Sequence, residues 1–419
     1  MADHARNRRF FACSSMLMLV VAGYMSFSLF WHEPIPSAWR VPLTLGLFLL
    51  SQSITSMRVL TTRRLPFRFV RAGGLVSAAF MTLSWLVLLR DALLAPALLL
   101  SLAVPALVPA RLWLFEHLLS IPFELAMAGS AVLLASLGMA LALRVPQVRR
   151  VAVPVPDLAP ELEGLRLVQL SDLHIGSAFD GGWLEKVVER TNAQDPDLVL
   201  ITGDLVDGSP ERIGRHLRPL LTLRARYGVL ASPGNHDHYS GLSAWMETWR
   251  SWGLPFLVNE HKDFRVQGRL VRVAGVTDSC ARHFPDLAPG VSPPDTRRAL
   301  NTPYREERRA AAPQLTPVER PAQLPRADLT VLLAHRPGEA RQNAATGVDV
   351  QLSGHTHGGQ LFFLFPLVSH MTTGFRSGLY RAGNMPLYVS PGTGMWGYMP
   401  MRFGSRSEIS LLELTRRPL

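Results

Sequence analysis

The residues best suited to chemistry in this chain are histidines and aspartates gathered in short segments. His355 and His357 stand two residues apart between glycines, so one turn can bring both imidazoles into one small volume. The same side-chain types recur from residue 172 onward in Asp172-Leu173-His174, Gly203-Asp204-Leu205-Val206-Asp207, Gly234-Asn235-His236-Asp237 and the lone His335. Carboxylate, imidazole and amide groups in this number predict a site for two metal ions about 3.5–4 Å apart.

Each of these segments follows a short apolar run that predicts a strand, at residues 165–170, 198–202, 229–232, 329–334 and 348–352. Helical patterns lie between them, at 183–192, 213–226, 242–252 and 338–344, and further strands are predicted at 271–276, 387–390 and 409–414. Strands that alternate with helices indicate an α/β sheet, whose sites lie at the carboxyl ends of its strands. Each segment alone could be an ordinary turn, but five at successive strand ends favour one common site.

The first 145 residues or so have a different character and are mostly apolar. Four runs, at residues 10–31, 41–57, 73–89 and 121–143, approach the roughly 17–25 residues that a membrane-spanning helix needs. A further run at 92–110 is apolar but interrupted by Pro96, Pro105 and Pro109. We expect that run to be interfacial or re-entrant, which gives about four spans in total.

Arginines predict the sidedness of this membrane part. They are dense between the second and third runs and again after the fourth: Arg58, Arg63, Arg64, Arg68, Arg71, Arg144, Arg149 and Arg150. Such loops stay in the cytoplasm. We therefore expect a multi-pass protein of the inner (cell) membrane, with the following part on the cytoplasmic face. A fifth span at 92–110 would reverse that orientation.

These features give predicted boundaries of 1–145 for the transmembrane region, 146–162 for a Pro/Val-rich linker and 163–419 for a soluble α/β domain. Residues 284–326 are rich in Pro, Arg and Ala without periodicity, which predicts a loop insertion. The net charge of +11 could indicate nucleic-acid binding, but no basic stripe interleaves with aromatic residues, so membrane-flanking arginine is favoured. The two cysteines, Cys13 and Cys280, do not suggest a disulfide framework.

The order Asp-x-His, Gly-Asp-x-x-Asp, Gly-Asn-His-Asp, His, Gly-His-x-His resembles the calcineurin-like metallophosphoesterases over about residues 163–415. Segments 171–177, 354–360 and 387–394 are most similar to the bacterial membrane-associated branch of the YkuE type. The resemblance implies a four-layer α-β-β-α sandwich, with two mixed sheets flanked by helices. It also implies a metal-dependent phosphoesterase.

Carried over by position, the resemblance implies two sets of metal ligands that share one aspartate. One set is Asp172, His174, Asp204 and His357, and the other is Asp204, Asn235, His335 and His355. This mixture of oxygen and nitrogen ligands suits two divalent ions of Mn, Fe or Zn. His236 would face the substrate and stabilise or protonate the leaving oxygen, and Asp207 would orient it. An ordinary turn carboxylate remains the alternative for Asp207, and Asp237 is expected to be a structural acid.

Two such ions would lower the pKa of a bridging water and hold the phosphoryl group for in-line attack. Protein phosphatases of this fold carry an arginine where this chain has Gly208, which disfavours a phosphoprotein substrate. Arg336 and Arg402 are candidate phosphate contacts.

The sequence thus predicts a membrane-anchored phosphohydrolase that cleaves a phosphodiester, pyrophosphate or phosphomonoester. Its expected partners are the lipid bilayer and a phosphorylated small molecule or lipid-linked substrate, such as an envelope precursor. Nucleic acid is not expected as a partner, although a nuclease is one alternative. The other is a non-catalytic receptor or scaffold that uses the same fold for binding.

Overall fold

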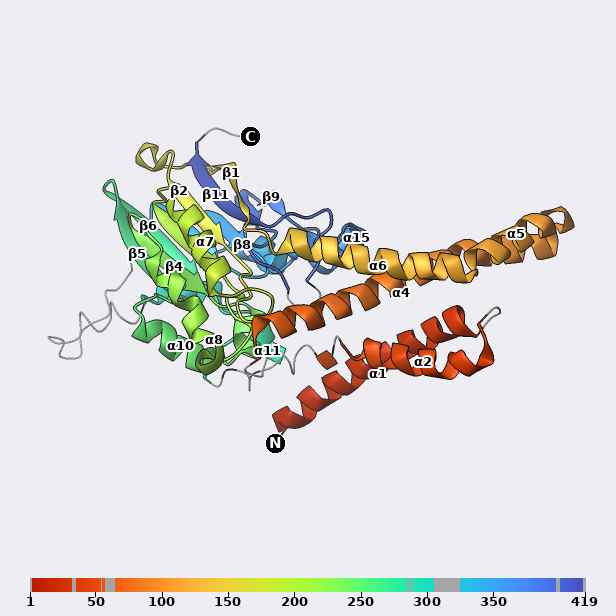
Figure 1. The fold of residues 1–419 in the computed structure, drawn as a ribbon. Helices are drawn as coiled ribbons and strands as arrows, with labels where there is room; N and C mark the ends of the chain where they lie inside the picture. The colour runs from red at the N-terminus through yellow and green to blue at the C-terminus, as the bar shows by residue number, and fades with distance from the viewer. Residues whose placement is uncertain are drawn as a thin grey trace. The chain divides into compact units, whose positions relative to one another are not determined.

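The computed structural model describes residues 2–31, 35–53, 55–56, 65–283, 285, 288, 290–304, 325–396 and 400–416. By its contacts the chain divides into two compact units (Figure 1). One contains Met1–Leu143 and Gly397–Met401, and the other contains Arg144–Trp396 and Arg402–Leu419. We call the first the helical unit and the second the catalytic unit, because the second contains the side chains of the expected metal site.

The helical unit contains α1 (Ala2–Phe30), α2 (Ser37–Ser51), α4 (Phe67–Ala103), η1 (Pro105–Leu107), α5 (Val108–Leu118) and α6 (Ile121–Ala142). Among the described residues, α4 with 37 residues and α6 with 22 are long and apolar enough to cross a membrane. The predicted runs at 10–31 and 41–57 correspond to α1 and α2, whose apolar parts are shorter. Residue 57 and the arginines at 58, 63 and 64 lie outside the described residues.

The run at 92–110, expected to be interfacial or re-entrant, is divided between two helices. Its first part continues α4 as far as Ala103, with Pro96 inside the helix. Helix α4 ends there, and Val104 is extended. Pro105 and Pro109 then lie in the first turns of η1 and α5. Proline fits a first helical turn because the amide hydrogen it lacks has no intrahelical partner there. Pro105 and Pro109 therefore mark the starts of the two helices that follow residue 103.

The catalytic unit contains two mixed sheets. The first has the order β1-β11-β2-β3-β4 and the second β5-β6-β7-β8-β10-β9. Their bounds are β1 Gln147–Pro154, β2 Arg166–Leu170, β3 Leu198–Thr202, β4 Gly228–Ser232, β5 Glu260–Val266, β6 Arg269–Gly275, β7 Leu329–Leu333, β8 Val350–Ser353, β9 Gly378–Ala382, β10 Met385–Val389 and β11 Glu408–Thr415. In the first sheet β2, β3 and β4 run parallel, as do β6, β7, β8 and β10 in the second.

The core is apolar because the central strands are buried and consist mostly of apolar residues. Leu167, Leu200 and Leu230 of the first sheet join Val331 and Leu352 of the second in one fully buried cluster. The helices and short turns that accompany the sheets are η2 Pro160–Leu162, α7 Gly181–Asn192, α8 Pro210–Leu217, η3 Arg218–Thr222, α9 Asn235–Tyr239, α10 Leu242–Ser251, α11 Cys280–His283, α12 Thr296–Asn301, η6 Pro337–Glu339, α14 Ala340–Ala344, η7 His357–Gly359, η8 Phe362–Leu364 and α15 Phe365–Met371. The expected α/β sandwich of two mixed sheets with helices is confirmed.

Three predicted boundaries change. The helix expected at 213–226 is two shorter elements, α8 and η3, with Pro219 in the first turn of η3. The stretch 146–162, predicted as a linker, contains β1, which pairs in parallel with β11 from Gln147 to Pro154. Within the predicted insertion 284–326, residues 296–301 form α12, while residues 305–324 lie outside the described part of the chain.

Candidate metal centre

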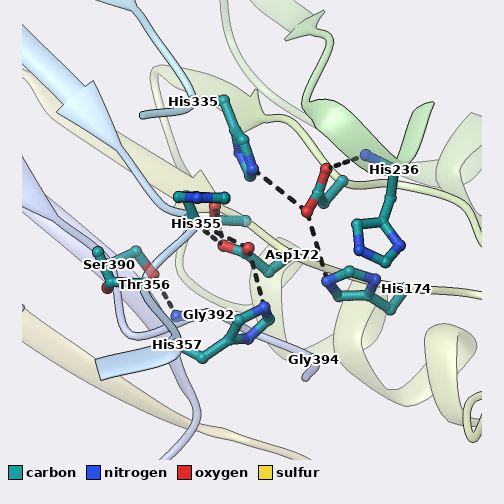
Figure 2. A network of polar contacts seen from close by, with 12 residues as sticks. Asp172, His174, His236, His335, His355, Thr356, His357, Ser390, Gly392 and Gly394 are labelled. Atoms are coloured by element: carbon teal, nitrogen blue, oxygen red, sulfur yellow. Dashed lines mark hydrogen bonds and ion pairs between the residues drawn. The ribbon is translucent and has the colours of Figure 1, made fainter. Parts of the chain in front are cut away.

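Five strand ends carry the candidate side chains, as the sequence predicts. Asp172 and His174 follow β2, Asp204 and Asp207 follow β3, and Asn235 and His236 begin α9 shortly after β4. His335 follows β7, and His355 and His357 follow β8. Because both sheets end toward the same region, these side chains converge (Figure 2).

Three groups of convergent side chains have ligand atoms within 4.8 Å of one another, and Asp204 connects two of them. Asp172, His174 and His357 form the first, and Asp204, His335 and His355 form the second. The third group is His174, Asp207 and His236. The Oδ2 atom of Asp204 lies 3.6 Å from His174 Nε2 and 3.2 Å from His335 Nε2. Asp204 therefore has the central position that a bridging carboxylate requires.

The nitrogen and oxygen atoms that face this centre are suitable ligands for a pair of divalent cations. In the described structure, the buried atoms His174 Nε2, His335 Nε2 and Asn235 Oδ1 have no hydrogen-bond partner. The other ring nitrogen of each histidine is occupied: His335 Nδ1 lies 2.9 Å from Thr202 O, and His174 Nδ1 lies 3.2 Å from Asp207 Oδ2. An unsatisfied buried polar atom costs about 1–3 kcal/mol, and cation ligation removes that cost.

The backbone at these residues is strained in one common way. Asp172, His174, Asp204, His355 and His357 all have positive φ, between 48° and 70°. Non-glycine residues rarely adopt this region, and such conformations cost on the order of 1–3 kcal/mol each. Strain of this kind concentrates at functional sites, because packing around the site holds the side chains in a required direction.

Two glycines make room for the ligands. Gly203 has a φ of +80°, and a Cβ there would lie 2.6 Å from His335 Nδ1. A Cβ at Gly354 would collide with the side chains of Ser171 and Asp172. Any larger residue at either position would push a candidate ligand out of place.

Asp237 connects the loop after β3 to the loop after β4 by hydrogen bonds. Its buried carboxylate accepts hydrogen bonds from the backbone amides of Asp204 at 2.8 Å, Leu205 at 3.0 Å and Gly234 at 2.7 Å. Burial and the nearby charge of Asp204 raise the pKa of Asp237 to about 7. These contacts give Asp237 the structural role that was expected for it.

Asp207 contacts two imidazoles, one with each of its carboxylate oxygens. Its Oδ1 lies 2.6 Å from His236 Nδ1, and its Oδ2 lies 3.2 Å from His174 Nδ1. Burial alone would lower the pKa of His236, but the carboxylates of Asp207 and Asp204 outweigh burial and raise it to about 9. Its side chain is 13% exposed, so His236 borders the open side of the centre. The geometry therefore matches an orienting carboxylate better than an isolated turn residue.

A loop that the sequence analysis left without a role supports the first ligand group. Thr393 donates its backbone amide to Ser171 O at 2.7 Å, and its Oγ1 accepts from the Ser171 amide at 3.3 Å. Arg402 donates to Pro391 O and Gly394 O, both at 2.7 Å. Nothing in the sequence signals these contacts, since Pro-Gly-Thr-Gly is also an ordinary turn composition.

Arg402 was considered as a phosphate contact, and its surroundings contradict that. The residue is 4% exposed, and its guanidinium also donates to His357 O at 3.3 Å. Because its guanidinium donates to the backbone carbonyls of Pro391, Gly394 and His357, Arg402 stabilises the turn that carries His357.

Arg336 remains at the edge of the centre. Its side chain is 35% exposed, and its Nε donates to the buried Asp278 at 2.8 Å. Burial and the charge of Arg336 lower the pKa of His355 to about 3, which keeps that imidazole neutral. A contact between Arg336 and phosphate stays a prediction. His238 is buried, and its Nε2 lies 3.0 Å from Thr277 Oγ1.

Comparisons with known proteins agree with this arrangement. A family model described as calcineurin-like phosphoesterase matches residues 165–359. A transmembrane protein with metallophosphoesterase domain from Danio rerio is 36% identical over 67% of this chain and 60% of its own length. An uncharacterized metallophosphoesterase from Campylobacter jejuni is 31% identical over 74% of each chain. The metallophosphoesterase YkuE of Bacillus subtilis is 28% identical over 60% of this chain and 79% of its own length. The chain thus spans less than two thirds of the Danio rerio relative that it matches.

Proposed function

The chain belongs to the calcineurin-like metallophosphoesterase family, and we propose that it is a membrane-anchored hydrolase of phosphoric esters or anhydrides with two divalent metal ions. The observation that carries this proposal is the pair of Asp/His groups joined by Asp204. Members of the family use two divalent metals, and the unpartnered donor atoms fit such ions.

In this proposal Asp172, His174, Asp204 and His357 hold one ion, and Asp204, Asn235, His335 and His355 hold the other. When bound, the ions would supply a nucleophilic water at neutral pH and neutralise phosphoryl charge. Asp172 is kept in place by hydrogen bonds from Ser171 Oγ at 2.5 Å and from the His355 amide at 3.1 Å. Such hydrogen bonds orient the ligand side chains before substrate binds.

His236 is the proposed proton donor to the leaving oxygen. Its Nδ1 is engaged by Asp207, so Nε2 is the nitrogen that can face a substrate. The charged form that Asp207 and Asp204 favour is the form that can give up a proton as the ester bond breaks. Proton transfer of this kind contributes typically 10²–10⁴-fold to rate.

We further propose that the helical unit anchors the enzyme in the cell's inner membrane, with the catalytic unit on the cytoplasmic face. Two apolar helices of spanning length and the transmembrane description of the Danio rerio relative support membrane association. A green fluorescent protein fused after residue 419 should fluoresce, because that reporter folds in the cytoplasm. A periplasmic alkaline phosphatase reporter that is active at the same fusion point would place the catalytic unit outside.

The proposed substrate is a phosphodiester, pyrophosphate or phosphomonoester on a small molecule or a lipid. An anchor raises the effective concentration of substrates that share its membrane. Protein phosphatases of this fold carry an arginine at the position of Gly208, so this chain lacks that side chain beside Asp207. Its absence favours a diester or a lipid-linked group over a phosphoprotein.

The deciding test is hydrolysis of bis-p-nitrophenyl phosphate by the purified full-length chain with Mn²⁺, compared with its Asp204→Asn variant. We expect turnover by the parent and loss of essentially all of it in the variant, because one carboxylate serves both ions. Substrate profiling against diesters, monoesters and lipid-linked pyrophosphates would follow. A variant that keeps full turnover would remove Asp204 from the bridging position, and an inactive parent loaded with metal would favour a binding role for the fold.

A further inference from the structure

The segment that follows the His357 turn is apolar and yet exposed. Together η8 and α15 cover residues 362–371, and neither contains a buried residue. Phe362 is 62% exposed, Leu367 56% and Met371 72%. Single exposed apolar residues are normal on a protein surface, but several on one short segment indicate an interaction site. We call residues 362–371 the apolar segment.

Other helices of the catalytic unit behave differently. In α7 the apolar residues Trp183 and Leu184 are buried, and in α10 Trp245 and Trp249 are buried. These helices turn their apolar faces to the sheets and their charged faces to solvent, as amphipathic helices do. The apolar segment therefore is not an ordinary core helix, because its apolar side chains lie outside the core of its own unit.

The apolar segment is fixed in place at its inner side. The guanidinium of Arg376 lies 3.9 Å from the centre of the Phe365 ring, and Arg376 Nη1 donates to Gly358 O at 2.9 Å. A Cβ at Gly359 would approach Phe365 to 2.6 Å, so this ring packs directly on the turn. Whatever covers the outer side of the segment must therefore lie close to the turn that carries His357.

We propose that the apolar segment docks into the lipid–water interface of the bilayer that holds the helical unit. Phe362, Leu367 and Met371 would enter the boundary of the acyl chains, as the apolar faces of interfacial helices do. The exposed cationic side chain of Arg381, ten residues after the segment ends, suits an anionic lipid surface.

Chain connectivity favours a bilayer over another occupant. Only residues 143–146 separate the end of α6 from the start of β1. The catalytic unit is consequently tethered close to any membrane that α6 crosses, and a nearby bilayer is always available to the apolar segment. This inference rests on the proposed membrane location. It adds that lipid headgroups meet the protein beside the metal centre.

The test measures where residue 367 lies, with the full-length chain in proteoliposomes that contain anionic lipid. Cys13 and Cys280 are replaced by alanine, and a nitroxide is attached to Leu367→Cys. The matched control is Leu221→Cys, an apolar residue that is 39% exposed on η3. Collision of the nitroxide with oxygen, which concentrates in lipid, is compared with collision with a water-soluble nickel chelate.

We expect the oxygen-to-nickel ratio at 367 to exceed that at 221 several-fold. A nickel-accessible label at 367 would overturn the proposal. A label shielded from both reagents would also overturn it, since protein would then cover the segment, from this chain or a second copy. If Leu367→Cys fails to insert, Phe362→Cys is read in the same way. The measurement needs neither substrate nor metal, so its failure differs from failure of the proposed activity.

Discussion

At the scale of single residues, His236 and the metal ligands have separable roles. His236 lies in contact with Asp207 but in neither of the two groups that Asp204 connects. We expect His236→Ala to lower kcat by about 10²–10⁴-fold while the bound metal stays at the parental amount. Turnover of bis-p-nitrophenyl phosphate and elemental analysis of the same preparation measure the two effects.

The matched comparison for that experiment is His335→Ala, which removes a proposed ligand. Its metal content should fall together with its rate, because His335 Nε2 points at Asp204. If His236→Ala lost metal to the same extent, His236 would itself be a ligand and its proposed role as a proton donor would be wrong.

The sequence predicted which candidate side chains converge, because each follows an apolar strand within a few residues. It could not predict residues that act through their backbone contacts. Thr393 and Arg402 support the first ligand group from segments more than 200 residues away from Asp172. Their partners are carbonyl and amide groups, which leave no side-chain pattern in a sequence. Arg402 was instead considered for phosphate, since an arginine near a metal site has both uses.

At the scale of elements, the turns that follow the strands must stay narrow. Gly354 connects β8 to the His355 turn, and a Cβ there would collide with Ser171 and Asp172. We expect Gly354→Ala to lower the free energy of unfolding by about 1–3 kcal/mol, the usual cost of overpacking a tight site. Gly338→Ala is the control, since no atom lies within 4 Å of its Cβ position and its φ is not positive.

Thermal unfolding followed by circular dichroism, with and without Mn²⁺, compares these two glycine variants. The Gly354 variant should also bind Mn²⁺ more weakly, because the collision moves Asp172. Equal unfolding temperatures for both variants would show that the contact between these loops is looser than the structure indicates.

The strands that the sequence missed are all at sheet edges. β1 is the outer strand of the first sheet, and β5 and β9 are the outer strands of the second. Edge strands carry charged and exposed side chains, which protect them from pairing with other chains. Arg149 and Arg150 of β1 are exposed, and the alternating stretch therefore looked like a linker. Central strands, in contrast, consist mostly of buried apolar residues, and their ends were predicted to within two residues.

At the scale of the whole molecule, metal binding should be linked to the stability of the catalytic unit. The centre joins loops from both sheets. It contains buried ring-nitrogen and amide-oxygen atoms without a hydrogen-bond partner, and five candidate ligand residues with positive φ. A ligand present at about 1,000 times its Kd stabilises a protein by about 4 kcal/mol. We expect chelation to lower the unfolding temperature of the catalytic unit by roughly 10 °C.

Calorimetry of the full-length chain in detergent, with EDTA and then with Mn²⁺ restored, measures this shift. The Asp204→Asn variant should unfold at nearly one temperature under both conditions, because it lacks the shared ligand. A parent protein that is insensitive to EDTA would mean that the loops hold their conformation without cations.

The helical unit has its own charged centre. Arg90 is almost fully buried and lies 2.9 Å from Asp91 and 3.3 Å from Glu124, while Ser28 donates to Asp91 at 2.5 Å. Charged groups within apolar helices are paired in this way because isolated charges are expensive there. These contacts join α1, α4 and α6 into one bundle, an arrangement that apolar runs alone could not predict.

The pairing of β1 with β11 also determines how a force on the proposed membrane anchor would be transmitted to the catalytic unit. β1 follows α6 after four residues and joins its sheet only through β11, by eight consecutive residue pairs. Tension directed along β1 would therefore shear the whole ladder at once, which resists force better than opening pairs one by one. The first residue of β11, Glu408, also bonds Gly392 and Thr393 in the loop behind Asp172. If the helical unit is anchored as proposed, mechanical stress in the bilayer would reach the loop behind Asp172 by a short path of covalent and hydrogen bonds.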